Sequence, residues 1–373
     1  MKKTKITTIL GTRPELIRLS LIIKRLDEVF DHRLVHTGQN SDSMLSEVFF
    51  KELNIRKPDL HLEIKNSTLG LFLGSLLPAI ELEFENNPPD AVVILGDTNS
   101  ALSGIIAKRK QIPIYHLEAG NRSFDQNVPE EINRRIVDHF ADYNLAYTNN
   151  AKDNLLREGI HPRNIAVIGS PLCEVIYRFS NEINASKIIK ELRLESGNFF
   201  LVSTHRQENV DDQSRLHDLI QSLNEIALKF GLPVVISTHP RTKSMLDKIE
   251  LEINPLLTFH NPFGFIDYCK LQKEARIVIS DSGSVSEEAV ILGFKAITIR
   301  NSMERPEALE SGSIVLSGIN AKSVLKAIEV IESGSVSKSP PYEYLIPDTS
   351  TRVVNFVTSS IFQHKFWSGL RKP

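Results

Sequence analysis

Short runs of apolar, often β-branched residues alternate along this chain with longer segments of helical periodicity. Such alternation is typical of βαβ units, in which helices cover both faces of a parallel sheet. The pattern predicts strands at residues 6–10, 33–36, 91–95, 112–116, 143–147 and 165–168, and a second series at 199–203, 234–237, 256–259, 276–280, 296–299 and 313–316. Helices are predicted at residues 14–29, 43–53, 99–110, 129–141, 151–158, 213–230, 243–252, 266–274, 285–292, 321–332 and 349–365.

The two series predict two doubly wound, Rossmann-like α/β domains. A length of 373 residues agrees with this number, because a typical domain has roughly 150 residues. The changeover falls within residues 169–185, where a Gly-Ser-Pro turn precedes a polar segment. We expect the first domain to span residues 1–172 and the second to span residues 173–348.

The composition is that of a globular protein, with 41% hydrophobic and 24% charged residues. The net charge of −2 provides no overall positive field, so neither a nucleic acid nor an anionic membrane is an expected partner. Cys173 and Cys269 have no metal-ligand spacing, which argues against a disulfide framework and a zinc site. Without a signal peptide or an apolar run of ~20 residues, the chain is expected to be soluble and cytoplasmic.

Polar residues gather in the loops that follow the predicted strands. In an open parallel sheet these loops meet at the carboxyl edge, where ligands bind, so we expect them to line one cleft. The loops are residues 11–15, 37–40, 96–99 and 118–122 in the first series, and 204–209, 238–241 and 281–284 in the second.

Several of these positions have a plain structural explanation. Gly11 and Pro14 could simply form a tight turn, but a cation such as Arg13 opposes the helix dipole at that position, and a bound anion would resolve the conflict. Asp97 could be a helix N-cap, the commoner role of such an Asp. The turn at residues 282–284 offers backbone N–H groups and hydroxyls suited to a diphosphate, although this motif is weak by itself.

The remaining candidates are carboxylates and histidines. Glu118 ends a predicted strand, where a structural role is less obvious, whereas Glu130 and Glu131 lie in the first turn of a helix, and Glu131 forms an ordinary i,i+4 pair with Arg135. In the second series, His205 and His239 each follow a strand beside an arginine, an arrangement that fits phosphate recognition better than metal binding.

Seven motifs occur in the order seen in the non-hydrolysing UDP-N-acetylglucosamine 2-epimerase family, which the chain resembles over roughly residues 6 to 330. They are Gly11-Thr12-Arg13-Pro14-Glu15, Gly96-Asp97-Thr98, Glu118-Ala119-Gly120, Pro129-Glu130-Glu131-x-x-Arg134, Thr204-His205-Arg206, Ser280-Asp281-Ser282-Gly283 and Glu304-Arg305-Pro306-Glu307.

The resemblance implies a GT-B architecture, in which two Rossmann-like domains face a cleft and the C-terminal helix, residues 349–373, returns to the first domain. It implies a homodimer, no cofactor and a UDP-sugar substrate destined for surface polysaccharide. The implied catalytic residues are Asp97, Glu118, Glu130 and His205. The implied substrate-binding residues are Arg13, Arg18, Phe263, Tyr268, Ser282, Gly283, Ser284, Glu288 and Arg305, with Tyr268 beside the uracil and Glu288 at the ribose.

A few positions differ from the commonest family pattern. Arg18 replaces a lysine, Ser284 replaces a glycine, and Gln207 alters the histidine loop. The segments 36–40 and 118–125 are more similar to the branch that makes UDP-N-acetyl-L-fucosamine, which epimerises C2 of a 6-deoxy L-sugar. The sequence therefore leaves two substrates open: UDP-N-acetylglucosamine and a 6-deoxy L-hexosamine analogue, of which we expect the second to be turned over better.

The implied reaction inverts C2, whose proton is not adjacent to a carbonyl. Elimination of UDP followed by its re-addition requires cationic donors for the diphosphate and two carboxyls in different protonation states. A GT-B glycosyltransferase would share the fold and the UDP-sugar, but would have no need of three carboxylates in the first domain. A non-catalytic sugar-binding protein would leave the same carboxylates without a purpose.

Overall fold

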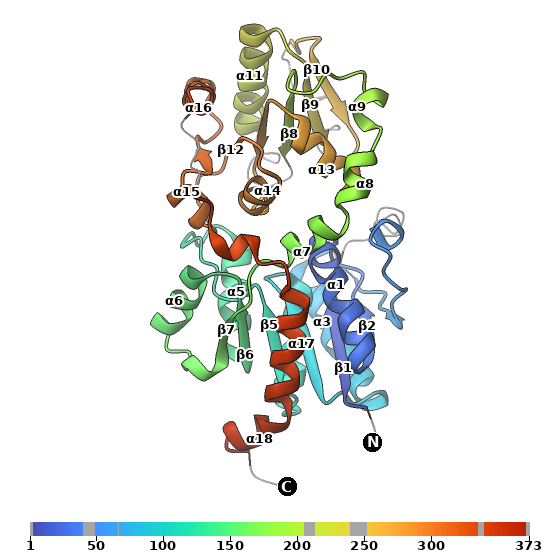
Figure 1. Ribbon diagram of the computed structural model, residues 1–373. Helices are drawn as coiled ribbons and strands as arrows, with labels where there is room; N and C mark the ends of the chain where they lie inside the picture. The colour runs from blue at the N-terminus through green and yellow to red at the C-terminus, as the bar shows by residue number, and fades with distance from the viewer. Residues whose placement is uncertain are drawn as a thin grey trace. The chain divides into compact units, whose positions relative to one another are not determined.

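A computed structural model describes residues 3–39, 49–65, 67–204, 213–238, 252–334 and 339–370. These residues form two compact units. The first unit comprises Met1–Tyr177 with Glu343–Pro373, and the second comprises Arg178–Tyr342. Each has one sheet of parallel strands with helices packed on it (Figure 1). The predicted fold class, two doubly wound α/β domains of the GT-B type, is confirmed.

The sheet of the first unit has seven strands in the order β3-β2-β1-β4-β5-β6-β7. The strands are β1 (Lys5–Leu10), β2 (Asp31–His36), β3 (Leu60–His61), β4 (Ala91–Leu95), β5 (Ile114–Leu117), β6 (Tyr143–Ala146) and β7 (Ile165–Val167). The helices are α1 (Arg13–Val29), α3 (Leu69–Asn86), η1 (Asn99–Ser103), α4 (Gly104–Arg109), α5 (Pro129–Phe140), α6 (Asn149–Arg157), η2 (Pro162–Asn164) and α7 (Pro171–Arg178). Winding reverses between β1 and β4, which makes this pair the switch point of the sheet.

The sheet of the second unit has six strands in the order β10-β9-β8-β11-β12-β13, with its switch point between β8 and β11. The strands are β8 (Phe200–Thr204), β9 (Val234–Thr238), β10 (Leu257–His260), β11 (Ile277–Ser280), β12 (Ala296–Thr298) and β13 (Ile314–Leu316). The helices are α8 (Ser180–Ala185), α9 (Ile188–Glu191), α11 (Gln213–Phe230), α13 (Phe265–Glu274), α14 (Val285–Leu292), α15 (Glu307–Glu310) and α16 (Ala321–Glu332). The core of this unit packs α11 and α16 against β8, β9, β11 and β12.

The C-terminal segment belongs to the first unit, where α17 (Thr349–Ser360) packs against α1 (Figure 1). The phenol of Tyr115 on β5 lies 2.8 Å from the hydroxyl of Ser360. Glu174 on α7 accepts hydrogen bonds from the backbone nitrogen and the hydroxyl of Ser350, at 2.7 and 2.5 Å. The segment also contains η3 (Tyr342–Leu345), η4 (Ile361–Gln363) and α18 (His364–Trp367).

The helix α3 is a clear departure from the predicted pattern, which assigns no element to this region. This helix is apolar on its outward side as well as on its inward side, and it contains Pro78, so its sequence has no amphipathic period. The predicted helix 99–110 is divided into η1 and α4, and the predicted helix 243–252 lies almost wholly outside the described residues. Among the described helices, none has both the length and the apolar composition needed to cross a bilayer.

Candidate functional site

A buried carboxyl joins the two loops at the switch point of the first sheet. Glu15, in the first turn of α1, accepts hydrogen bonds from the backbone nitrogens of Gly11 and Thr12, at 3.0 and 2.8 Å. Its other oxygen accepts a bond of 3.1 Å from the hydroxyl of Thr98, in the loop after β4. Burial raises the pKa of Glu15 to about 7, because desolvation outweighs these hydrogen bonds. The loops after β1 and β4 are thereby held in contact.

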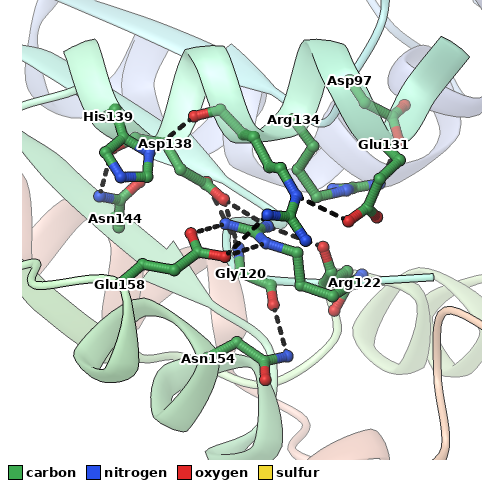
Figure 2. Close-up of polar contacts among 12 residues, drawn as sticks. Asp97, Gly120, Arg122, Glu131, Arg134, Asp138, His139, Asn144, Asn154 and Glu158 are labelled. Atoms are coloured by element: carbon green, nitrogen blue, oxygen red, sulfur yellow. Dashed lines mark hydrogen bonds and ion pairs between the residues drawn. The ribbon is translucent and has the colours of Figure 1, made fainter. Parts of the chain in front are cut away.

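One guanidinium binds two of the predicted catalytic carboxylates. Nη2 of Arg134, on α5, pairs with Oδ2 of Asp97 (Figure 2) and lies 3.2 Å from Oε1 of Glu118. Asp97 is therefore not the helix cap that its position allowed, since the N-cap residue of η1 is Thr98. Two carboxylates in the loops after the neighbouring strands β4 and β5 thus converge on one side chain of α5.

Glu118 is held in an unusual backbone conformation. Its φ of +64° is in the left-handed region, which costs a residue other than glycine about 1–2 kcal/mol. The carbonyl oxygen of Glu118 accepts a 2.6 Å hydrogen bond from Nη1 of Arg134, and its nitrogen donates to the carbonyl of Leu145 at 3.1 Å. Oε2 lies 3.4 Å from Nε of Arg18, whose guanidinium lies over the ring of Tyr147. Backbone and side chain are therefore both fixed by cationic neighbours.

The two carboxylates differ in exposure. The side chain of Asp97 is 17% exposed and pairs with Arg134, whereas that of Glu118 is 8% exposed and lies beside both Arg134 and Arg18. Unequal environments can give two carboxyls different protonation states, which acid–base chemistry on one substrate requires.

The other first-unit candidates occupy the starts of helices. Glu130 is exposed in the first turn of α5, one turn before Arg134 and hence on the same face of the helix. Glu131 is buried and accepts bonds of 2.8 Å from the nitrogen of Ser123 and from Nε of Arg135. The structural role predicted for Glu131 is confirmed. Arg13 is the first residue of α1, and its guanidinium lies 5.8 Å from the ring of Phe49.

A buried polar network holds the loop that follows Glu118 (Figure 2). Arg122 is 2% exposed and binds Glu158 on α6 through two nitrogens, at 2.9 and 2.6 Å. Gly120 has a φ of +82°, and a Cβ there would lie 2.2 Å from the carbonyl oxygen of Ala151. Asn154 on α6 donates to the carbonyl of Gly120 at 3.0 Å. The loop is therefore anchored to α6.

In the second unit, the predicted diphosphate turn follows β11 at the switch point. The hydroxyls of Ser282 and Ser284 lie 2.9 Å apart, and the nitrogens of both residues donate within the turn, to Oγ of Ser280 and of Ser282. The side chain of Arg305 lies against this turn, because a Cβ on Gly283 would be 2.7 Å from its Nη1. A guanidinium, two hydroxyls and the start of α14 thus lie together, which suits an anion.

The predicted nucleoside residues lie on α13, on α14 and in the loop before α13. Glu288 on α14 accepts a 2.5 Å hydrogen bond from Nε2 of Gln272, and Tyr268 lies on α13. Burial, followed by the negative charge of Glu288, raises the pKa of Tyr268 well above its usual range. The ring of Phe263 lies 5.5 Å from that of His260. The predicted catalytic His205 is outside the described residues, and so are His239 and the loops around both.

The sequence alone indicated no role for three residues that the structure places at these loops, two arginines and one glutamate. Arg134 stands four residues after Glu130, a spacing that places both on one face of α5 and could have drawn attention to it. Glu15 ends the first motif and carries no further signal. Arg300 is 2% exposed, pairs with Glu304 at 2.6 Å, and its Nη1 would lie 3.5 Å from a Cβ on Gly283.

Comparison with known proteins gives a consistent result. The sequence profile of the family described as UDP-N-acetylglucosamine 2-epimerase matches residues 24–358. A UDP-N-acetylglucosamine 2-epimerase of Methanocaldococcus jannaschii is 38% identical over 338 residues, which cover 88% of this chain and 92% of that protein. A UDP-2,3-diacetamido-2,3-dideoxy-D-glucuronate 2-epimerase of Pseudomonas aeruginosa is 36% identical over 84% of this chain and 88% of its own length.

A solved structure is similar over nearly the whole chain. The crystal structure of M. jannaschii UDP-GlcNAc 2-epimerase in complex with UDP-GlcNAc and UDP superposes with a TM-score of 0.89 at 36% identity. The match covers 95% of this chain and 100% of that one.

Proposed function

Because this chain belongs to the UDP-N-acetylglucosamine 2-epimerase family, we propose that it inverts C2 of a UDP-N-acetylhexosamine, converting UDP-N-acetylglucosamine to UDP-N-acetylmannosamine. The observation that carries this proposal is the convergence of Asp97 and Glu118 on Arg134 at the carboxyl edge of the first sheet. The runner-up functions, glycosyl transfer and passive sugar binding, give these paired carboxylates no task. Cys173 and Cys269 form no disulfide, which fits a reducing compartment, and we place the reaction in the cytoplasm.

The proposed reaction proceeds by elimination and re-addition. A carboxylate removes the C2 proton while the bond between C1 and the diphosphate oxygen breaks, which leaves a 2-acetamidoglycal and UDP. UDP then adds back to C1 as a carboxylic acid returns a proton to the other face of C2. Asp97, Glu118 and Glu130 are the proposed acid–base groups. Arg134 holds both Asp97 and Glu118, and Arg18 also contacts Glu118.

The second unit supplies the proposed contacts to the nucleotide. The turn at residues 282–284 and Arg305 bind the diphosphate, whose negative charge grows as the bond to C1 breaks. Glu288 binds the ribose hydroxyls, and Phe263 with Tyr268 lies beside the uracil. Arg13 and His205 are the further cationic groups that we assign to the departing UDP.

The hexosamine of the substrate has two candidate identities. Relatives of nearly equal identity have names that specify different sugars. The resemblance to the 6-deoxy L-sugar branch rests partly on Asn121 and Arg122, which are 5% and 2% exposed and lie in the loop that Glu158 anchors. The ion pair with Glu158 gives Arg122 a structural role. We therefore name UDP-N-acetylglucosamine as the substrate and use the 6-deoxy analogue as the competitor in its test.

The decisive experiment is NMR of the purified protein with each UDP-sugar in D2O and without an acceptor. We expect UDP-N-acetylglucosamine to epimerise and the product to carry deuterium at C2, because the returning proton comes from a carboxyl that exchanges with solvent. Retention of the original hydrogen would exclude the elimination route, and absence of turnover would exclude the function. A higher kcat/KM for UDP-2-acetamido-2,6-dideoxy-L-hexose would assign the chain to the other branch.

We also propose that the active form is a homodimer. The helix α3 exposes apolar side chains that a monomer would leave in water: Leu69, Leu71 and Leu82 are 54%, 51% and 58% exposed. On α5, which is connected to α3 through contacts with α4, Ile132 and Ile136 are 51% and 48% exposed. Sedimentation should show a dimer for the wild type and a monomer for the double variant Leu71→Glu, Leu82→Glu. A monomeric wild type would contradict this assignment.

A further inference from the structure

Asp138 on α5 lies at the centre of the buried polar network that holds the loop after Glu118 (Figure 2). Its carboxylate oxygens lie 3.3 and 3.2 Å from the backbone nitrogen of Gly120. Oδ1 is also 2.9 Å from Nδ1 of His116, and Oδ2 is 2.7 Å from Nη1 of Arg122. One carboxylate therefore contacts strand β5, the loop that follows this strand and a buried guanidinium.

His116 links Asp138 to the loop that follows the neighbouring strand, β4. Its Nε2 lies 2.8 Å from the carbonyl oxygen of Gly96, and a carbonyl oxygen can only accept a hydrogen bond, so Nε2 carries a proton. Nδ1 faces Asp138 at ion-pair distance, off the axis of an ideal hydrogen bond. The ring therefore links the carbonyl of Gly96 to the carboxylate of Asp138.

The charges around Asp138 favour its ionised form. Burial alone would raise the pKa of Asp138, but the hydrogen bond and charge of His116, together with the guanidiniums of Arg122 and Arg134, hold the pKa below its ordinary value. The side chains of His116 and Asp138 are both 0% exposed. Neither side chain can therefore touch a substrate, and any influence on the reaction must act through the residues that they hold.

Both ends of this pair adjoin a candidate catalytic carboxylate. Gly96, whose carbonyl binds His116, immediately precedes Asp97. Gly120, whose nitrogen binds Asp138, follows Glu118 by two residues, and Glu118 has the left-handed backbone described above. A shift of the pair would move both carboxylates, and misplacement by about 1 Å can cost 10²-fold in rate.

We propose that His116 and Asp138 form a buried pair that positions Asp97 and Glu118 together for proton transfer at the substrate. The pair consists of positioning residues, and its effect on turnover rests on the proposed function. Its effect on the two loops does not depend on the identity of the sugar.

The first test compares Asp138→Asn with Asp142→Asn, a matched control at the other end of β5. Asp142 is also buried and accepts a 3.0 Å bond from the nitrogen of Ile114, and it pairs with Lys108 at 2.5 Å. We expect Asp138→Asn to lower kcat by 10-fold to 100-fold with the Kd for UDP within about twofold of wild type. Asp142→Asn should lower only the thermal stability. Equal kcat values for the two variants, corrected for the folded fraction, would overturn the proposal.

The second test needs neither substrate nor activity. In protein labelled with 15N-histidine, the signals of His116, assigned by their loss in His116→Asn, should show a proton on Nε2, the nitrogen that faces the carbonyl of Gly96. A tautomer with an unprotonated Nε2 would overturn the contact on which the pair depends. If Asp138→Asn does not fold, this measurement on the wild type still tests the proposed pair. If the wild type lacks epimerase activity, the ring signals still report on the pair, so the two failures are distinguishable.

Discussion

The switch points of the two sheets combine arginines and carboxylates in different arrangements. In the first unit, the loops after β4 and β5 present Asp97 and Glu118 to Arg134 and Arg18. In the second, the loop after β11 presents its backbone and hydroxyl groups beside Arg305, and the carboxylates pair with that arginine.

Arg305 shows how the second arrangement works. Nε of Arg305 lies 2.8 Å from Glu287, while Nη1 is the atom that approaches Gly283. Glu287, together with Glu304 at 3.4 Å from Nη1, thus orients the guanidinium against the turn. In the first unit the roles are reversed, because arginine orients the acids. The same doubly wound frame therefore suits proton transfer in one unit and anion binding in the other.

The largest expected effect is on kcat, and it separates proton transfer in the first unit from anion binding in the second. Glu118→Gln keeps the size of the side chain and removes its ability to carry a proton, so kcat should fall on the order of 10²-fold or more, with the Kd for UDP nearly unchanged in calorimetry. Glu131→Gln is the matched control, because Glu131 is also a buried acid. It binds Ser123, in the loop after Glu118, and Arg135 on α5. A comparable loss of kcat in the control would refute the special role of Glu118.

The next effect tests whether the first unit also contributes to nucleotide binding. Arg13→Ala should weaken UDP binding by roughly 1.5–3 kcal/mol, the contribution of a charge-assisted bond to phosphate. Calorimetric titration with UDP alone measures it. Unchanged affinity with a lower kcat would place Arg13 among the groups that serve the chemistry.

A smaller effect is expected at the second switch point. In Gly283→Ala the new Cβ would lie 2.7 Å from Nη1 of Arg305, which Glu287 prevents from moving freely. We expect UDP to bind about tenfold more weakly and kcat at saturating substrate to change little. Gly74→Ala is the control, since no atom lies within 4 Å of a Cβ at that position. Wild-type UDP affinity in Gly283→Ala would argue against the turn as the diphosphate site.

The smallest effect concerns stability and pH. Burial raises the pKa of Glu15 from 4.5 to about 7, so the folded protein binds a proton that the unfolded chain releases. Its contribution is fully present below pH 4.5 and is lost as the pH rises to about 7. Relative to Glu15→Gln, which does not titrate, the free energy of unfolding of the wild type should fall by about 1 kcal/mol per pH unit in this window. Urea unfolding at several pH values measures this, and parallel curves would contradict it.

Local patterns in the sequence determined much of the architecture. The helices α11, α14 and α16 begin and end at the predicted residues, because amphipathic periodicity and turn residues are encoded within the segment itself. The predicted strands lie within two residues of the observed ones, with β3 unpredicted. Their apolar runs mark the carboxyl edge and so identify the loops that carry Asp97, Glu118 and the 282–284 turn. The helix α3 was not predicted from the sequence because its outward face is also apolar.

The tertiary structure alone decided which of these residues meet. Strand order brings β4 beside both β1 and β5, and only then can Arg134 bind Asp97, which is 37 positions away in sequence. Likewise, Asp97 could have been a cap until packing placed it against Arg134, and only packing shows that Arg122 is buried against Glu158. Such pairings depend on the geometry of a whole sheet and its helices, and no local stretch of sequence contains that information.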